Sequence, residues 1–216
     1  IRLDREPSKN AGLRVTDAAT APLVLMVLAG EVNRWLVASL ERAGVPAVGL
    51  CGADGGLFAA KKLCPGGQDI GYVGEVAGVR TKVCDDLLAA GWTPVVATVG
   101  PLASTEAGDH SQFYNINADQ AAAPLARAVH ADALLFLTDV EGVLGAEGER
   151  LPRLTPTQVD RLRAAGILRG GMLPKVAAAL EGARALPAGL VKIAPAAGCD
   201  AVLDALAADH GTRFDA

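Results

Sequence analysis

The chain has 216 residues, a formal net charge of −4, and a composition that is 51% hydrophobic but only 4% aromatic. No basic stripe runs through it, which argues against nucleic acid as a main partner. The apolar content, with 25 glycines spread between apolar runs, is more typical of a soluble α/β enzyme with a core of Ala, Val and Leu than of a disordered or fibrous chain.

The first third of the chain predicts a long helix and a hairpin. We expect Thr16 to cap a helix over about residues 17–43. Its most apolar stretch, residues 18–30, is too short to span a bilayer, so we expect a buried helix and no membrane partner. Further elements are expected as a strand over 45–50, hairpin strands over 57–63 and 70–76, and a helix over 80–90.

The remaining elements alternate between strands and helices. We expect strands over 93–100, 133–143 and 189–195, and helices over 117–130, 155–166, 173–186 and 199–208. The helix over 155–166 has the strongest signal, with Thr155 as N-cap and Pro156 in the first turn. This alternation predicts an α/β fold with a mainly parallel or mixed sheet that helices cover on both faces.

Several familiar kinds of site are excluded by inspection. No two glycines stand two positions apart, so the dinucleotide fingerprint is absent, and Tyr72 occupies the lysine position of a near P-loop spacing. The three histidines are scattered, and we expect no protein metal site. The four cysteines form no C-x-x-C pair and no signal peptide precedes them, which predicts reduced thiols in a cytoplasmic protein.

Polar residues instead gather at the ends of predicted elements. The stretch "YNINADQ" (114–120) places three of them at a helix start, and "GLRVTD" (12–17) places Arg14 just before another helix. The carboxyl ends of strands in open α/β sheets are where ligands bind. The residues concerned in the first half of the chain are Arg14, Asn115, Asn117 and Asp119.

Two further stretches have the same character in the second half. "LTDVEGV" (137–143) puts Thr138 and Asp139 at the end of a strand, and "GGMLPK" (170–175) puts a Gly170–Gly171 loop before a helix. Such a loop can offer backbone N–H groups to a phosphate, with Lys175 adding a positive charge.

Each of these residues also has a simpler interpretation. Arg14 could form a surface ion pair, and Asn117 could serve only as a helix N-cap. Asp139 could cap a turn, and Lys175 could be an ordinary solvated lysine. The combination of all four stretches, rather than any one of them, favours a ligand site.

Taken together, these stretches resemble the amino acid kinase family, and within it the branch that phosphorylates N-acetyl-L-glutamate in arginine biosynthesis. "GLRVTD", "NINAD" and "GGMLPK" are the specific blocks, and the similarity extends over nearly the whole chain in the family's order. The resemblance implies a three-layer αβα sandwich with a central, mostly parallel sheet. It also implies an acyl-amino-acid lobe over 1–130 and a nucleotide lobe over 131–216.

The resemblance further implies roles for the residues at these positions. Substrate binding would fall to Arg14, Asn115 and Asn117, and catalysis to Lys175, with Asp119 orienting positive groups. The nucleotide site would be lined by Thr138, Asp139, Gly170, Gly171 and Met172. The expected cofactor is ATP with Mg²⁺, the other partner is N-acetyl-L-glutamate, and the expected assembly is a homo-oligomer, dimer or hexamer, formed through the region 17–43.

The chemistry of the residues agrees with that reading. The acceptor is a carboxylate that is already ionised at neutral pH, so the site needs no general base. Phosphoryl transfer depends on positioning and charge neutralisation, which lysine, backbone N–H groups and Mg²⁺ supply. The planar guanidinium of Arg14 suits a carboxylate because it can donate two parallel hydrogen bonds.

Two phosphate loops of the family, K-x-G-G and H-G-G-G, have no counterpart in these 216 residues. We therefore expect the chain to be a piece of a longer protein. Two alternatives to the kinase of N-acetylglutamate stay open at this point. One is a catalytically inactive binding or regulatory module of the same fold, and the other is an aminoadipate kinase of lysine biosynthesis.

Overall fold

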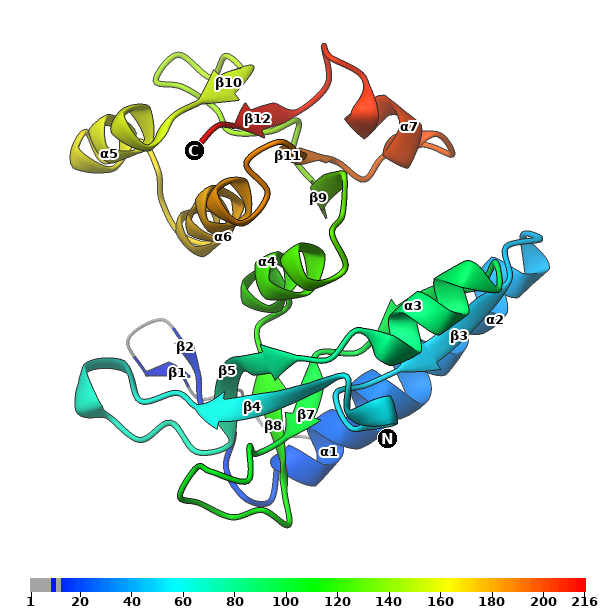
Figure 1. Ribbon diagram of the computed structural model, residues 1–216. Helices are drawn as coiled ribbons and strands as arrows, with labels where there is room; N and C mark the ends of the chain where they lie inside the picture. The colour runs from blue at the N-terminus through cyan, green and yellow to red at the C-terminus, as the bar shows by residue number, and fades with distance from the viewer. Residues whose placement is uncertain (1–8, 11–12) are drawn as a thin grey trace. The chain divides into compact units, whose positions relative to one another are not determined.

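The computed structural model describes residues 9–10 and 13–216, with side chains from Val15 onward (Figure 1). The chain forms two compact units that divide between Ala121 and Ala122. This division falls inside helix α4 (Ala118–Ala128), whereas the sequence placed the change of lobe after residue 130.

Unit 1 begins with two short strands, β1 (Lys9–Asn10) and β2 (Leu13–Arg14), which pair antiparallel. A continuous helical segment follows, made of α1 (Ala21–Leu25), a π-helix η1 (Met26–Val32) and α2 (Asn33–Arg42). The predicted cap at Thr16 is wrong. Thr16 pairs with Gly71 in an isolated β-bridge, and the first helical turn is instead held by Asp17, whose Oδ1 accepts a hydrogen bond from the Thr20 amide at 2.7 Å.

The prediction that this helix is buried is also wrong. Its inner face packs on a small cluster through Val24, Leu25, Leu28 and Ala29, but its outer face is open. Trp35 is 66% exposed and Met26 is 53% exposed. The segment Ala21–Arg42 also meets the length and hydropathy criteria for a membrane span, which is weak evidence because core helices of soluble proteins meet them too.

The rest of unit 1 contains two further sheets and three short helices. Strands β3 (Ala47–Leu50) and β6 (Thr93–Val96) pair in parallel. The second sheet has the order β4-β5-β8-β7 and contains the predicted hairpin of β4 (Phe58–Lys62) and β5 (Val73–Val79). The other elements are the one-turn helices η2 (Asp54–Gly56) and η3 (Pro65–Gly67), helix α3 (Lys82–Ala89), and strands β7 (Val99–Pro101) and β8 (Phe113–Ile116).

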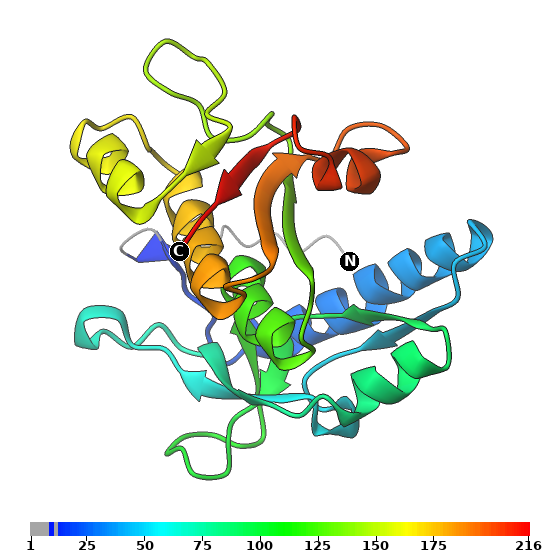
Figure 2. The same ribbon diagram turned by 45° about the horizontal axis from the view of Figure 1, so that its top comes forward.

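Unit 2 is a four-stranded sheet with the order β10-β12-β11-β9, in which β12 lies beside β11 (Figure 2). Helix α6 contacts β11, β9 and β12, and α7 contacts β11 and β9. Its elements after α4 are β9 (Ala133–Thr138), β10 (Arg153–Leu154), α5 (Pro156–Ala164), α6 (Met172–Ala185), β11 (Leu190–Pro195), α7 (Ala201–Leu206) and β12 (Thr212–Phe214).

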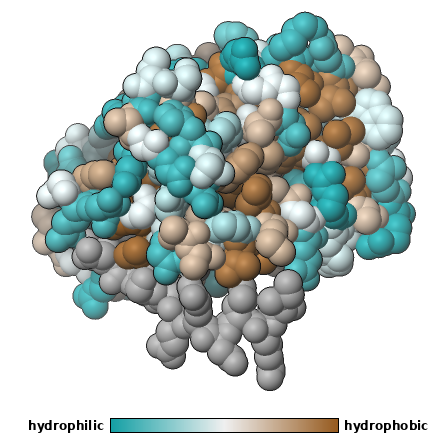
Figure 3. All heavy atoms as spheres, turned by 90° about the horizontal axis from the view of Figure 1, so that it is seen from below, coloured by the Kyte–Doolittle hydropathy of each residue, from teal (hydrophilic) through white to brown (hydrophobic). Residues whose placement is uncertain are grey.

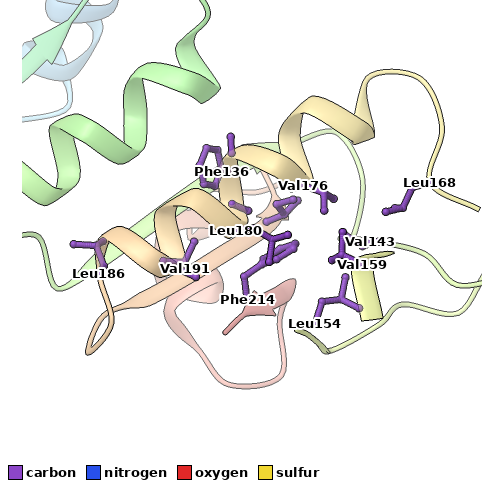
Figure 4. Packing of buried hydrophobic residues seen from close by; sticks show 14 of the residues in the cluster. Phe136, Val143, Leu154, Val159, Leu168, Val176, Leu180, Leu186, Val191 and Phe214 are labelled. Carbon is purple, nitrogen blue, oxygen red and sulfur yellow. The ribbon is translucent and has the colours of Figure 1, made fainter. Parts of the chain in front are cut away.

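The core of unit 2 lies between α6 and the sheet. Val176 and Leu180 of α6 meet Phe136 of β9 and Phe214 of β12 (Figure 4). The predicted N-cap of α5 at Thr155 is confirmed, and the structure shows a full capping box there: the Thr155 side chain accepts from the Gln158 amide, and the Gln158 side chain accepts from the Thr155 amide.

The predicted α/β class is therefore confirmed, with both parallel and antiparallel strand pairs. On the face drawn in Figure 3, apolar side chains reach the surface at several separate places among hydrophilic ones. Exposed apolar residues scattered in this way are usual for folded proteins.

Candidate functional site

In unit 1 the predicted substrate residue Asn115 lies where three segments meet. The Asn115 amide donates to the Tyr72 carbonyl at 2.8 Å, and the Tyr72 amide donates to the Thr16 carbonyl at 2.7 Å. Gly71 has a φ of +77°, and a Cβ there would lie 2.1 Å from the Thr16 carbonyl oxygen. Only glycine permits this approach, so the local sequence brings Thr16 and Asn115 together.

The side chain of Asn115 is half-buried and only loosely held. Its Nδ2 lies 3.5 Å from Thr16 Oγ1, at the outer limit of a hydrogen bond. The Thr16 side chain itself is buried. Asn115 can therefore turn its amide to a ligand without breaking a strong bond. The side chain of Arg14, two residues before Thr16, lies outside the described residues, and only its place in β2 is defined.

Asn117 takes the capping role that was its simpler interpretation. Its Oδ1 accepts from the amide of Asp119 at 2.9 Å and from that of Gln120 at 3.3 Å, which closes the first turn of α4. Asp119 is half-buried in that first turn, where a negative charge is favoured by the helix dipole. Contact of either side chain with substrate stays a prediction.

In unit 2 the Gly170–Gly171 turn has the geometry of an anion-binding loop. Gly170 has a φ of +54° and Gly171 a φ of −65°, so a left-handed residue precedes a right-handed one at the start of α6. Among the described residues, neither amide donates a hydrogen bond to the backbone, and a Cβ built on either glycine meets nothing within 4 Å. Successive N–H groups in such a turn, at a helix N-terminus, form a concave site for a phosphate.

Lys175 and the end of β9 lie beside this turn. The Lys175 Nζ is 5.9 Å from the centre of the Phe136 ring, which puts the first turn of α6 over the carboxyl-terminal half of β9. Thr138 ends that strand, and its hydroxyl donates to the exposed Asp139 carboxylate at 3.1 Å. The structure thus brings the predicted nucleotide residues into one region of unit 2.

The loop after β9 is held by residues that the sequence reasoning missed. The Thr212 hydroxyl accepts from the Val143 amide at 2.9 Å and donates to the Leu151 carbonyl at 2.6 Å, and Thr212 is fully buried. Arg150 donates to the carbonyls of Asp209, at 2.7 Å, and Gly211. No local sequence pattern identifies Thr212 and Arg150, because their hydrogen-bond partners are more than fifty positions away in the chain.

A second cation ties the end of the chain to the sheet. Lys192 of β11 is 3% exposed, and its Nζ donates to the carbonyls of Ala207 and, at 2.9 Å, His210. Burial lowers the pKa of Lys192 from its ordinary value. The two hydrogen bonds from this buried amine therefore stabilise the conformation of the loop 207–211.

The described residues contain no group of three or more His, Cys, Asp or Glu side chains arranged to hold a metal ion. Mg²⁺ seldom needs such a cage, because it is usually bound through one or two carboxylates and the phosphates of a substrate. The exposed carboxylate of Asp139, at the end of β9, is a side chain of the kind that suits this mode.

Comparison with known proteins gives a consistent result. The profile described as "Amino acid kinase family" matches residues 2–189. Acetylglutamate kinase from Koribacter versatilis is 46% identical over 199 residues, which cover 91% of this chain and 72% of that protein. Acetylglutamate kinase from Acidiphilium cryptum is 46% identical over 183 residues, covering 80% of this chain and 59% of the relative.

A solved structure is similar to this chain in both fold and sequence. The crystal structure of smu.665 from Streptococcus mutans UA159 superposes with a TM-score of 0.76 and 32% identity, over 88% of this chain and 73% of that one. The resemblance inferred from "GLRVTD", "NINAD" and "GGMLPK" is thereby confirmed at the level of the family.

Proposed function

The chain belongs to the amino acid kinase family, and from that premise we propose that the protein transfers the γ-phosphoryl group of ATP to the side-chain carboxylate of N-acetyl-L-glutamate. The product is an acyl phosphate, and the step belongs to arginine biosynthesis. The substrate follows from the curated relatives named acetylglutamate kinase, of whose lengths the chain spans 72% and 59% in the two pairs above. The observation that carries the proposal is the Gly170–Gly171 turn beside Lys175 at the end of β9.

The nucleotide is proposed to bind in unit 2. The amides of Gly170 and Gly171, which donate to no backbone group in the described part of the chain, donate to phosphate oxygens, and the positive end of the α6 dipole favours the same charge. Lys175 neutralises negative charge on the phosphates as the bond to the leaving group breaks. The rest of the nucleotide site is lined by Thr138, Asp139 and Met172. Bound Mg²⁺ would neutralise phosphate charge, with Asp139 as the carboxylate that could hold it.

The acyl amino acid is proposed to bind in unit 1. Asn115 donates its side-chain amide to the substrate, since its bond to Thr16 is long and weak. Arg14 pairs with a carboxylate through its guanidinium, which is fixed in charge at every physiological pH. Asp119, at the start of α4, orients positive groups at the reacting centre, while Asn117 fixes the helix start that carries it.

We further propose that the protein acts in the cytoplasm as a homo-oligomer. All four cysteines are free, as expected where thiols stay reduced. The outer face of Ala21–Arg42 carries Met26, Val32, Trp35 and Leu36, each between 41% and 66% exposed. An apolar helix face of this kind is stabilised when a second copy covers it.

The test is a coupled assay of ADP release with the whole protein as its gene encodes it. We expect turnover with N-acetyl-L-glutamate and at least tenfold lower kcat/KM with the aminoadipate homologue, because one methylene displaces the reacting carboxylate. A higher kcat/KM for the aminoadipate homologue would overturn the assignment of N-acetyl-L-glutamate as the substrate. Binding of ATP without turnover of either acid would overturn the reaction and favour an inactive binding module.

A further inference from the structure

Tyr72 connects the Asn115 site to a loop that lies outside it. The backbone of Tyr72 is bonded on one side to Thr16 and on the other to Asn115, as described above. Its side chain leaves that junction, and the ring lies 5.3 Å from the ring of Tyr114 at an angle of 56°. The Tyr72 hydroxyl then donates to Asp109 Oδ2 at 3.1 Å, in the loop 102–112 between β7 and β8.

Asp109 is the residue that organises this loop. Its Oδ1 accepts from the Ser111 amide at 2.8 Å and from the Ser111 hydroxyl at 2.5 Å, so one carboxylate oxygen closes the turn and the other is left for Tyr72. These bonds, those from Ser111 first, hold the pKa of the Asp109 carboxyl below its ordinary value. The carboxylate is therefore charged at neutral pH and stays an acceptor for the Tyr72 hydroxyl.

The loop also lies directly against the residue that precedes Asn115. A Cβ built on Gly108 would be 3.2 Å from the Tyr114 hydroxyl oxygen and 2.8 Å from Leu102. Tyr114 is 1% exposed, so the contact with the loop completes its burial. A loop that moves away would uncover Tyr114 and loosen the end of β8, where Asn115 sits.

We propose that Tyr72 and Asp109 are positioning residues that set the affinity of the Asn115 site for its acyl amino acid. Their hydrogen bond fastens the loop 102–112 over Tyr114 and so keeps Asn115 in its binding geometry. When the bond is absent, a smaller fraction of molecules is competent to bind, and the apparent affinity falls by that fraction. The inference rests on the proposed function for the identity of the acid.

The kinetic test compares Tyr72→Phe, Asp109→Ala and the double variant in the whole protein. Tyr72→Phe keeps the ring contact with Tyr114 and removes only the hydroxyl. We expect KM for N-acetylglutamate to rise by about three- to tenfold, with kcat and KM for ATP within twofold, because one hydrogen bond to a carboxylate is lost. In the Asp109→Ala background, Tyr72→Phe should have no further effect.

The matched control is Glu75→Gln. Glu75 lies in strand β5 of the same hairpin, and its carboxylate is 3.7 Å from the Lys61 amine in an exposed ion pair of which Thr16 and Asn115 are not members. Glu75→Gln should leave every kinetic constant unchanged. An unchanged KM in Tyr72→Phe, or equal increases for ATP and the acid, would overturn the inference.

A substrate-free readout separates this inference from the proposed function. Hydrogen exchange of the peptides that cover residues 102–116 should be faster in Tyr72→Phe than in the wild type or Glu75→Gln. If the wild type does not turn over N-acetylglutamate, the proposed function fails. Faster exchange in Tyr72→Phe would still support the inference that the Tyr72–Asp109 hydrogen bond holds the loop 102–112. Unchanged exchange over 102–116 would reject that inference, whichever acid is the substrate.

Discussion

Replacing Thr212 by valine tests how the end of the chain holds the loop that follows β9. Valine has the same shape as threonine but lacks the hydroxyl that joins the Val143 amide, at 2.9 Å, to the Leu151 carbonyl, at 2.6 Å. Thr212 and Val143 are both 0% exposed, so water cannot replace the lost partner at the Val143 amide without moving the loop.

The size of the effect follows from those two bonds. A buried donor or acceptor left without a partner costs about 1–3 kcal/mol. The Val143 amide should contribute the full amount and the half-buried Leu151 carbonyl a smaller one. We therefore expect Thr212→Val to lower the free energy of unfolding by about 2–4 kcal/mol. The loop 139–150 should also loosen, which raises KM for ATP.

The assay is urea denaturation followed by far-ultraviolet circular dichroism, with the midpoint compared at unchanged slope. Thr93→Val is the control, because Thr93 is an exposed residue of β6 and should change stability by less than about 0.5 kcal/mol. If Thr212→Val loses less than about 1 kcal/mol, the buried hydroxyl does not hold the loop in the way described.

Three further outcomes follow from the same structure. Lys175→Met, which keeps the apolar stem beside Phe136, should lower kcat by about 10²–10³ with little change in stability; an unchanged kcat would remove Lys175 from the reaction. Trp35→Asp should reduce the mass in light scattering to that of a monomer; an unchanged mass would place the interface elsewhere. Arg153 and Arg213 hold the pKa of Asp215 below its ordinary value. The stabilisation is therefore present above about pH 4 and lost as pH falls below it, so thermal denaturation of Asp215→Asn should depend less on pH in that range than denaturation of the wild type.

The sequence predicted the elements whose signals are local. The start of α5 is predicted from Thr155 and Pro156 alone, and the structure has Thr155 as the N-cap. The turn at Gly170–Gly171 likewise depends on two adjacent glycines. Both could be found without knowledge of the fold.

The sequence could not show contacts made between distant segments. Thr16 is a good cap by type, but its partner is Gly71, fifty-five positions away, and this bridge draws it out of the helix start. The three-residue strand β12 has no periodicity to detect, although Thr212 holds a loop sixty-nine positions earlier. Short strands of this kind gain their stability from neighbours rather than from their own residues.

The prediction that the first helix is buried was wrong for a different reason. The apolar residues in Ala21–Arg42 show that one or more faces avoid water, but they do not show which molecule covers each face. Within the described residues, Val24 and Leu28 pack on their own unit, whereas Trp35 remains 66% exposed.

The most direct test of the account is to trap the product with hydroxylamine, which converts an acyl phosphate into a hydroxamate. We predict a hydroxamate of N-acetylglutamate that forms only when ATP and the acid are both present, in amounts that match ADP release. ADP release without hydroxamate would contradict transfer to the carboxylate, and absence of both would contradict the proposed reaction as a whole.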